Sequence, residues 1–227
     1  MSAIIDLDNV GKVYQMGDTE LEALRDSNVE IEEGEFVAVM GPSGSGKSTL
    51  MNMIGALDTP SSGEVFVGEE AISGLGEDEL ALLRSKRIGF IFQQFNLIPS
   101  MNATENVALP MLFRGVGKKK RTERAEEILE KVGLGDRLEH MPSELSGGQR
   151  QRVSIARSLA NNPDIILADE PTGNLDTETG EKIMDLLTDL NEEGKTIVMV
   201  THDENDAEYA DRIIKIVDGK TGVKQEK

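Results

Sequence analysis

One short stretch, Gly41 to Thr49, constrains the fold of this 227-residue chain more than any other feature. It reads GPSGSGKST and fits the pattern G-x-x-x-x-G-K-[ST] from Gly41 to Ser48. The apolar run Phe36–Met40 before it predicts a buried strand, and the apolar positions from Ser48 to Ala56 predict the start of a helix. A strand, a glycine-rich loop and a helix in this order are typical of a site for the phosphates of a nucleoside triphosphate.

The residue types in this loop explain why it could hold phosphate. Glycines let the backbone curl with its N–H groups pointing inward, and a helix N-terminus adds further N–H groups and a partial positive charge. We expect Lys47 to reach the β- and γ-phosphates and the Ser48 hydroxyl to bind Mg²⁺. The alternative is a Gly/Ser-rich turn that binds no ligand, and the flanking strand and helix argue against that alternative. The residues expected to contact nucleotide here are Gly41, Pro42, Ser43, Gly44, Ser45, Gly46, Lys47, Ser48 and Thr49.

Charge and composition exclude several classes of protein. The chain has 24 Lys and Arg against 42 Asp and Glu, a net charge of −18, and such a field repels nucleic acid. The chain has no cysteine, which excludes disulfides and thiolate metal sites. The sequence contains no stretch of about 18 apolar residues and no signal-peptide pattern at its start. We therefore expect a protein that stays in the cytoplasm.

The order of the predicted elements indicates an α/β fold. Strands alternating with helices predict a mostly parallel sheet with right-handed crossovers. The alternation stops between Pro99 and about Gly148, where Thr104–Phe113 and Arg121–Val132 are predicted helices. This segment is interpreted as a helical insertion in the α/β core. After Gly219 the sequence is a short, polar tail.

Two adjacent carboxylates, Asp169 and Glu170, end a predicted apolar strand that begins at Ile165. In a parallel sheet, ligands bind at the carboxyl ends of the strands. Asp169 is thus expected to hold Mg²⁺, directly or through water, opposite Ser48. Glu170 is expected to orient and deprotonate the attacking water. A polar turn after a buried strand is the alternative, and the phosphate loop in the same chain argues against it.

A second glycine-rich entry into a helix lies at Leu145–Gln149, which reads LSGGQ. Ser146 is a good N-cap for a helix predicted from Gln149 to Ala160. Such an entry offers free N–H groups to an anion, although alone it would be interpreted as an ordinary capped helix. What favours a binding role is that this chain then has two anion-ready helix starts about a hundred residues apart.

Taken together, these motifs resemble those of the ATP-binding-cassette (ABC) ATPases over essentially the whole chain. They occur in that family's order: the phosphate loop, Gln93, LSGGQ, ILADE at 166–170, Gly173–Asp176 and His202. Within the family, IGFIFQQFNLIPSMNATENVALPM and ADEPTGNLDTETG are similar to the macrolide-export, lipoprotein-release and FtsE cell-division subgroup. The resemblance implies a single domain, residues 1–227. That domain has a phosphate-loop core, an N-terminal antiparallel β subdomain and a helical subdomain at approximately 99–160.

The resemblance also implies an assembly. ABC ATPases work as head-to-tail dimers of two copies with two ATP molecules at the interface, and the LSGGQ segment of one copy caps the γ-phosphate held by the other. In this chain that segment supplies Ser146, Gly147, Gly148 and Gln149. Asp176 would cross the dimer interface.

Three further residues receive roles from the resemblance. Tyr14 would stack on adenine, although a buried aromatic at a strand end is an equally good interpretation of its position. Gln93 would touch Mg²⁺ and the attacking water and would sense the membrane partner; its neighbour Gln94 is a rival. His202 is the expected γ-phosphate contact, in preference to His140, the only other histidine.

The function implied is ATP hydrolysis with Mg²⁺ that drives a separate integral membrane permease, at the cytoplasmic face of the cell membrane. One alternative is a cell-division type of ATPase that transmits the cycle across the membrane without moving a solute. Another is a DNA-repair or translation ABC protein, which the charge of −18 disfavours. The basic run Lys118–Arg121 could touch anionic lipid, but a solvated loop before a helix is the favoured interpretation.

Overall fold

The computed structural model describes residues 3–17 and 19–226. The chain divides into two compact units, which are described separately. The first unit comprises Met1–Arg84 and Asn191–Lys227, and the second comprises Ser85–Leu190.

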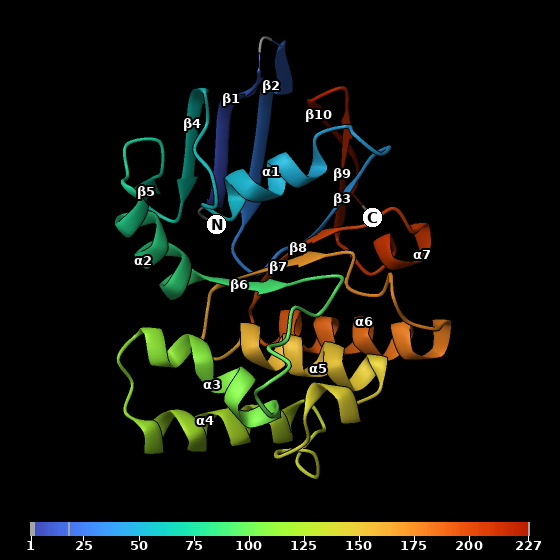
Figure 1. Ribbon diagram of the computed structural model, residues 1–227. Coiled ribbons are helices and arrows are strands. Elements are labelled where there is room, and N and C mark those ends of the chain that lie inside the picture. Colours follow the sequence, from blue (N-terminus) through green and yellow to red (C-terminus); the bar gives the residue numbers. More distant parts are fainter. Residues whose placement is uncertain (1–2, 18, 227) are drawn as a thin grey trace. The chain divides into compact units, whose positions relative to one another are not determined.

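The first unit holds most of the strands. Its elements are β1 (Ala3–Met16), β2 (Thr19–Glu32), β3 (Phe36–Met40), α1 (Lys47–Ile54), β4 (Ser62–Val67), β5 (Glu70–Ala71), β8 (Thr196–Val200), α7 (Glu204–Ala207), β9 (Arg212–Val217) and β10 (Lys220–Glu226), together with most of α2 (Glu77–Arg87). The strands β2, β1, β4 and β5 form an antiparallel sheet in that order (Figure 1). Its inward side chains alternate along β1, as in Ile5 and Leu7, which is the pattern of a sheet with one buried face. The predicted N-terminal antiparallel subdomain is confirmed.

A second set of strands surrounds β3, which pairs in parallel with both β8 and β9. The side chains of Phe36, Val37, Ala38 and Val39 are all buried, as expected for a strand covered on both faces. Such strands are continuous apolar runs, and β3 has the bounds, Phe36–Met40, that the sequence predicted. The short polar segment after Gly219 forms β10, which pairs antiparallel with β9.

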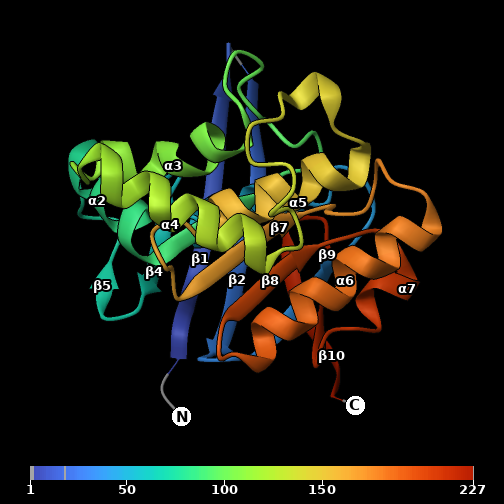
Figure 2. The ribbon, with the colours of Figure 1, turned by 90° about the horizontal axis from the view of Figure 1, so that it is seen from below.

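The second unit combines one strand pair with helices. Its elements are β6 (Ile88–Ile91), α3 (Ala103–Phe113), α4 (Lys118–Lys131), the 3₁₀ helix η1 (Pro142–Glu144), α5 (Gly147–Ser158), β7 (Ile165–Asp169) and most of α6 (Thr177–Glu192). β6 and β7 pair in parallel, which together with β3, β8 and β9 confirms the mostly parallel arrangement. The helices α3, α4 and α5 lie side by side (Figures 1 and 2). They fall within the predicted insertion, and the interpretation of the whole chain as one domain stays a prediction.

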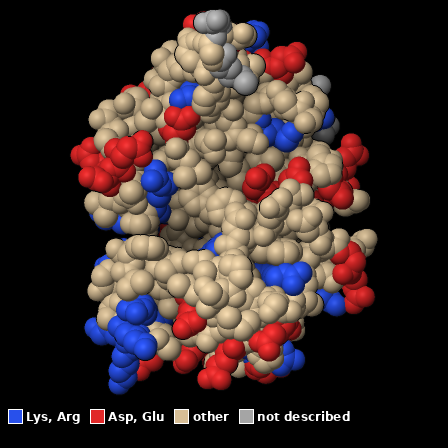
Figure 3. Space-filling model, in the orientation of Figure 1, with Lys and Arg blue, Asp and Glu red and all other residues tan. Residues whose placement is uncertain are grey.

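The basic run Lys118–Arg121 belongs to α4 and is not a loop, so that part of the sequence interpretation was wrong. The helix begins after Gly117, which serves as N-cap without a side-chain hydrogen bond. Lys118, Lys119 and Lys120 are exposed, and Figure 3 shows basic side chains gathered over this region at the lower left. Their contact with lipid stays a prediction.

Candidate nucleotide-binding site

The phosphate loop joins β3 to α1 in the first unit, and its backbone conformation requires glycine at two positions. Gly46 has φ +108°, and a Cβ there would lie 2.6 Å from the Ala23 carbonyl oxygen. A Cβ on Gly41 would lie 2.1 Å from the Ile216 carbonyl oxygen. Because Gly46 is also the N-cap of α1 and makes no side-chain cap bond, the helix presents its first N–H groups to the loop. This geometry suits an anion.

The polar side chains of the loop are arranged around the same curve. The Lys47 ammonium donates hydrogen bonds to the carbonyl oxygens of Gly41 at 2.7 Å and Pro42 at 2.9 Å. Ser45 is buried, and its hydroxyl has no hydrogen-bond partner among the described residues. Ser48 is exposed at the start of α1. The loop thus carries a cation, an unsatisfied hydroxyl and an accessible hydroxyl on one short turn.

The turn between β9 and β10 supports the back of the phosphate loop. The Gly219 amide donates to the Ser45 carbonyl oxygen at 2.9 Å. The Gly219 carbonyl in turn accepts the Arg25 amide at 2.8 Å and the Ser27 hydroxyl at 3.0 Å. Sequence reasoning missed this support, since residues near Gly219 carry no recognisable pattern.

Two predicted site residues of the first unit lie outside the loop. Tyr14 is half-buried, and its hydroxyl donates to the Asp58 carboxylate at 3.1 Å. The Lys12 ammonium lies 5.0 Å from the centre of its ring. Neither Lys12 nor Asp58 was singled out from the sequence. His202 follows β8 and is exposed, whereas its neighbour Thr201 is buried.

In the second unit, Asp169 is the last residue of β7 and Glu170 follows it. Both are half-buried. Glu170 has φ +44°, which is unusual for a residue with a side chain, and its carbonyl accepts the Gly173 amide at 3.1 Å. Backbone in this region is strained, and such strain is concentrated at functional sites. The turn from Glu170 to Gly173 changes the direction of the chain immediately after the two carboxylates.

Gln93 lies against the segment that follows Glu170. The Asn174 side-chain amide donates to the Gln93 carbonyl oxygen at 2.7 Å, and a Cβ on Gly173 would lie 2.7 Å from the Gln93 side-chain nitrogen. The neighbouring Gln94 is exposed. Two separate predicted motifs of the second unit, Gln93 and Gly173–Asp176, therefore come together, and this contact favours Gln93 over its rival.

The helix entry at Ser146 is built as a capping box. The Ser146 hydroxyl accepts the Gln149 amide at 3.2 Å, and the Gln149 side-chain oxygen accepts the Ser146 amide at 2.9 Å. Asp176 similarly accepts the amide of Thr179 at 3.0 Å and its hydroxyl at 2.8 Å. These bonds from Thr179 hold the pKa of the Asp176 carboxyl below its usual value. Asp176 is exposed and stays ionised at neutral pH.

The body of α5 contacts two of the loops already described. The Gln151 side-chain amide donates to the Pro171 carbonyl at 2.6 Å, just after Glu170. The Arg157 guanidinium donates to the carbonyl oxygens of Phe95 at 2.9 Å and Asn96 at 2.5 Å, just after Gln93. Burial lowers the pKa of Arg157 from its usual value. These contacts join α5 to the segments that carry the predicted catalytic residues.

Gly148 gives a first testable prediction. A Cβ there would lie 2.4 Å from the Thr179 methyl group, and Thr179 cannot rotate freely because its hydroxyl bonds Asp176. Gly148→Ala should therefore lower the free energy of unfolding by about 1–3 kcal/mol, as overpacking does. Thermal unfolding measures this loss.

Thr179→Ser should relieve the clash in the Gly148→Ala protein, because it removes the methyl group of Thr179 and keeps the hydroxyl. Gly148→Ala combined with Thr179→Ser should regain most of the lost stability. Gly74→Ala is the control, since Gly74 is exposed and a Cβ built there meets nothing within 4 Å beyond its chain neighbours. A double variant no more stable than Gly148→Ala would contradict the proposed clash.

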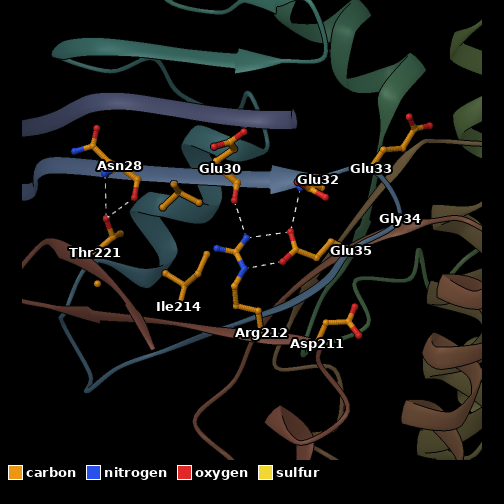
Figure 4. Close-up of a pocket in the computed structure, with 12 residues that line it drawn as sticks. Asn28, Glu30, Glu32, Glu33, Gly34, Glu35, Asp211, Arg212, Ile214 and Thr221 are labelled. Carbon is orange, nitrogen blue, oxygen red and sulfur yellow. Dashed lines mark hydrogen bonds and ion pairs between the residues drawn. The ribbon is translucent and has the colours of Figure 1, made fainter. Parts of the chain in front are cut away.

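A separate cavity of about 640 Å³ lies in the first unit (Figure 4). Arg212 makes a two-pronged ion pair with Glu35 at 2.6 and 3.0 Å and donates to the Glu30 carbonyl at 2.7 Å. The lining also includes the acidic residues Glu32, Glu33 and Asp211. Among the described residues that line this cavity, none is a predicted site residue. We interpret it as a structural feature of β2 and β9.

A buried strand, a glycine loop whose N-cap makes no side-chain bond to the helix, and a carboxylate pair at a strand end are together typical of a nucleoside-triphosphate-binding protein. Comparison of the sequence with known protein families identifies the family of this chain. The model of the ABC transporter family matches residues 24–173, and the chain belongs to this family as one of its ATP-hydrolysing cassettes.

Similar proteins cover nearly the whole chain. The ABC transporter ATP-binding protein YknY of Bacillus subtilis is 56% identical, over 95% of this chain and 94% of its own length. A solved structure of the MJ0796 cassette of Methanocaldococcus jannaschii, dimeric with ADP and Pi after hydrolysis, has a TM-score of 0.89 at 52% identity and covers 98% of both chains. The macrolide export ATP-binding/permease protein MacB of a Shewanella strain is 50% identical over 96% of this chain, which spans only 34% of MacB. The predicted fold and family are confirmed.

Proposed function

We propose that this chain binds ATP with Mg²⁺ and that its hydrolysis cycle drives a separate integral membrane permease at the cytoplasmic face of the cell membrane. The observation that carries the proposal is the phosphate loop, where Gly46 is the N-cap of α1, makes no side-chain cap bond and lies beside Lys47. No helix within 3–17 and 19–226 is both long and apolar enough to cross a membrane. MacB relatives, whose names include a permease, support the membrane partner.

The residues of the loop fit a triphosphate. The left-handed glycines leave room at the backbone, and the loop presents helix N–H groups, as phosphate requires. We assign Lys47 to the β- and γ-phosphates, where its ammonium would exchange the carbonyl oxygens of Gly41 and Pro42 for stronger charged acceptors. Tyr14 is assigned to the adenine face.

The candidate metal ligands also fit their ion. Ser48, Gln93 and Asp169 offer a hydroxyl, an amide oxygen and a carboxylate, which are the oxygen ligands that Mg²⁺ takes. When bound, Mg²⁺ supplies neutralisation of charge on the phosphate oxygens. Asp169 would act directly or through water.

The hydrolytic step belongs to three side chains. Glu170 would accept the proton of the attacking water and direct the water oxygen toward the γ-phosphorus, as the bond from that phosphorus to the leaving ADP breaks. Gln93 helps to hold that water, and the exposed His202 donates a hydrogen bond to the γ-phosphate. The strained backbone at Glu170, with φ +44°, supports a role in which the direction of this one carboxylate matters.

The second copy of the chain is proposed to complete each site. Ser146, Gly147, Gly148 and Gln149 of one copy would face the γ-phosphate held by the other. The capping box engages the Gln149 amide, and we assign the amides of Gly147 and Gly148 to the phosphate. Asp176 would cross the interface. The MJ0796 cassette, which is dimeric with ADP and Pi, supports this arrangement.

Mixing two inactive chains tests the shared site. A Ser146→Arg chain keeps a working phosphate loop, and a Lys47→Ala chain keeps a working LSGGQ segment. Each homodimer should be inactive, whereas the mixture should recover part of the wild-type ATPase rate, because a heterodimer contains one intact composite site.

Heterodimer formation is verified by co-purification on two different affinity tags. A mixture of Ser146→Arg with a chain that carries both substitutions is the control, since its heterodimer has no intact site. Demonstrated heterodimers without any recovered activity would argue against a site shared between two copies.

A further inference from the structure

The turn that follows α1 is bonded to consecutive residues of β1. The Ser61 amide donates to the Gly11 carbonyl at 2.8 Å, and the Val13 amide donates to the Ser61 hydroxyl at 3.1 Å. Between these two backbone contacts, side chains of β1 reach Asp58 and Thr59. The turn is thus bonded to β1 at every residue from Gly11 to Tyr14.

Lys12 is the centre of this connection. Its ammonium donates to the Asp58 carboxylate at 2.6 Å and to the Thr59 carbonyl at 2.7 Å. The Lys12 side chain is only 12% exposed, and its ammonium lies over one face of the Tyr14 ring, 5.0 Å from the ring centre. One face of the ring is therefore occupied by a cation, so a base that stacks on Tyr14 would have to use the opposite face.

The hydroxyl end of Tyr14 is fixed as well. Burial and then the hydrogen bond to Asp58 raise the pKa of Tyr14, so the phenol stays a neutral donor. Burial alone would raise the pKa of Asp58, but hydrogen bonds from Lys12, the Thr59 amide and Tyr14 outweigh it and lower that pKa. The two pKa shifts keep the donor protonated and the acceptor ionised at neutral pH.

We propose that Lys12 and Asp58 are positioning residues that hold the Tyr14 ring in the orientation in which it stacks on the nucleotide base. This inference rests on the proposed contact between Tyr14 and adenine. A ring that is already fixed loses little conformational entropy when the base binds, and preorganisation of this kind raises affinity. The contact uses the ring face, so it recognises a purine and does not read its edge.

Equilibrium binding of three probes separates this role from a general defect. The probes are the imido analogues of ATP and GTP, which are not hydrolysed, and ribose 5′-triphosphate, which has no base. Tyr14→Ala should weaken both base-containing analogues by about tenfold and leave ribose 5′-triphosphate unchanged. Lys12→Met should weaken the same two analogues by about threefold to fivefold, also without effect on the baseless probe.

Variants of the pair then test positioning. Lys12→Arg, which keeps a cation and donors, should restore affinity to within about twofold of wild type. Lys12→Met combined with Tyr14→Ala should bind no more weakly than Tyr14→Ala alone, because the two act through one ring. Asp58→Asn, which removes the charge at nearly constant shape, should resemble Lys12→Met and replaces it where that variant folds poorly. Lys119→Met, at a lysine 89% exposed, is the matched control for loss of a charge.

The outcomes are distinct. Lys12→Met and Asp58→Asn proteins that bind the analogues normally, while Tyr14→Ala binds them weakly, would overturn the positioning role. Equal weakening of ribose 5′-triphosphate would also overturn it, since the defect would then lie in the phosphate loop. A Tyr14→Ala protein with normal affinity for all three probes would instead refute the adenine contact of the proposed function.

Discussion

A Glu170→Gln protein should bind ATP with Mg²⁺ normally and hydrolyse it about a thousandfold more slowly than the wild type. Gln keeps the size and hydrogen-bonding reach of Glu but cannot act as a base at neutral pH, and a general base contributes about 10²–10⁴-fold to rate. The carboxylate lies just after β7, at the residue with φ +44°, and Gln occupies the same backbone without added volume. Steady-state ATPase assays and equilibrium binding measure the two effects separately.

The same variant should accumulate as a closed dimer. Without the Glu170 carboxylate near the γ-phosphate, repulsion in a chain of net charge −18 is also reduced. We expect a dimer in gel filtration with ATP, and a monomer with ADP or without nucleotide. The wild type should stay largely monomeric in each condition. Hydrolysis at the wild-type rate would refute the base assignment, and a slow variant that never dimerises would count against the shared site only.

Lys47→Ala should abolish ATPase activity and weaken ATP binding by about tenfold to a hundredfold. The loss corresponds to one charge-assisted contact to the phosphates. Isothermal titration with ATP and Mg²⁺ measures the affinity, and a coupled assay measures turnover. Unchanged turnover in the purified variant would remove the assignment of the phosphate loop.

Folding must be separated from binding in this variant. Lys47 donates to the carbonyl oxygens of Gly41 and Pro42, so its removal also deletes two contacts within the loop. Thermal unfolding without nucleotide reports that structural loss, and Lys220→Ala, at an exposed lysine of β10, is the matched control. A purely structural effect would lower stability without nucleotide and leave ATP affinity intact.

The parts of the fold that the sequence predicted are those decided by local pattern. β3 is a continuous apolar run because its side chains are buried in a parallel arrangement between β8 and β9, so its bounds could be predicted from the sequence. β10 is polar and follows a turn, and only its pairing with β9 makes it a strand. The start of α4 was misjudged because Gly117 caps it without any Ser, Thr, Asp or Asn signal.

The residues of the candidate site likewise fall into those that a local sequence pattern predicts and those that depend on tertiary contacts. The phosphate loop and the LSGGQ entry were predictable, because each is a short segment whose glycines and caps follow from its own backbone. Lys12 and Asp58 were not, since the ion pair joins segments 46 residues apart and neither residue has a pattern of its own. The bonds from Gln151 and Arg157 likewise depend on tertiary packing. The chemical roles of the predicted residues stay predictions until the variants are measured.

The support that the β9–β10 turn gives to the phosphate loop has a consequence for synthesis of the chain. The Ser45 carbonyl is bonded by Gly219, and Gly41 packs against the Ile216 carbonyl, so the loop relies on residues translated about 170 positions later. At about 5–20 residues per second, the ribosome adds them about ten to thirty seconds after the loop. A nascent chain should therefore expose an unsupported phosphate loop for that interval, and ATP should be able to act as a ligand for folding only once the β9–β10 turn has left the exit tunnel.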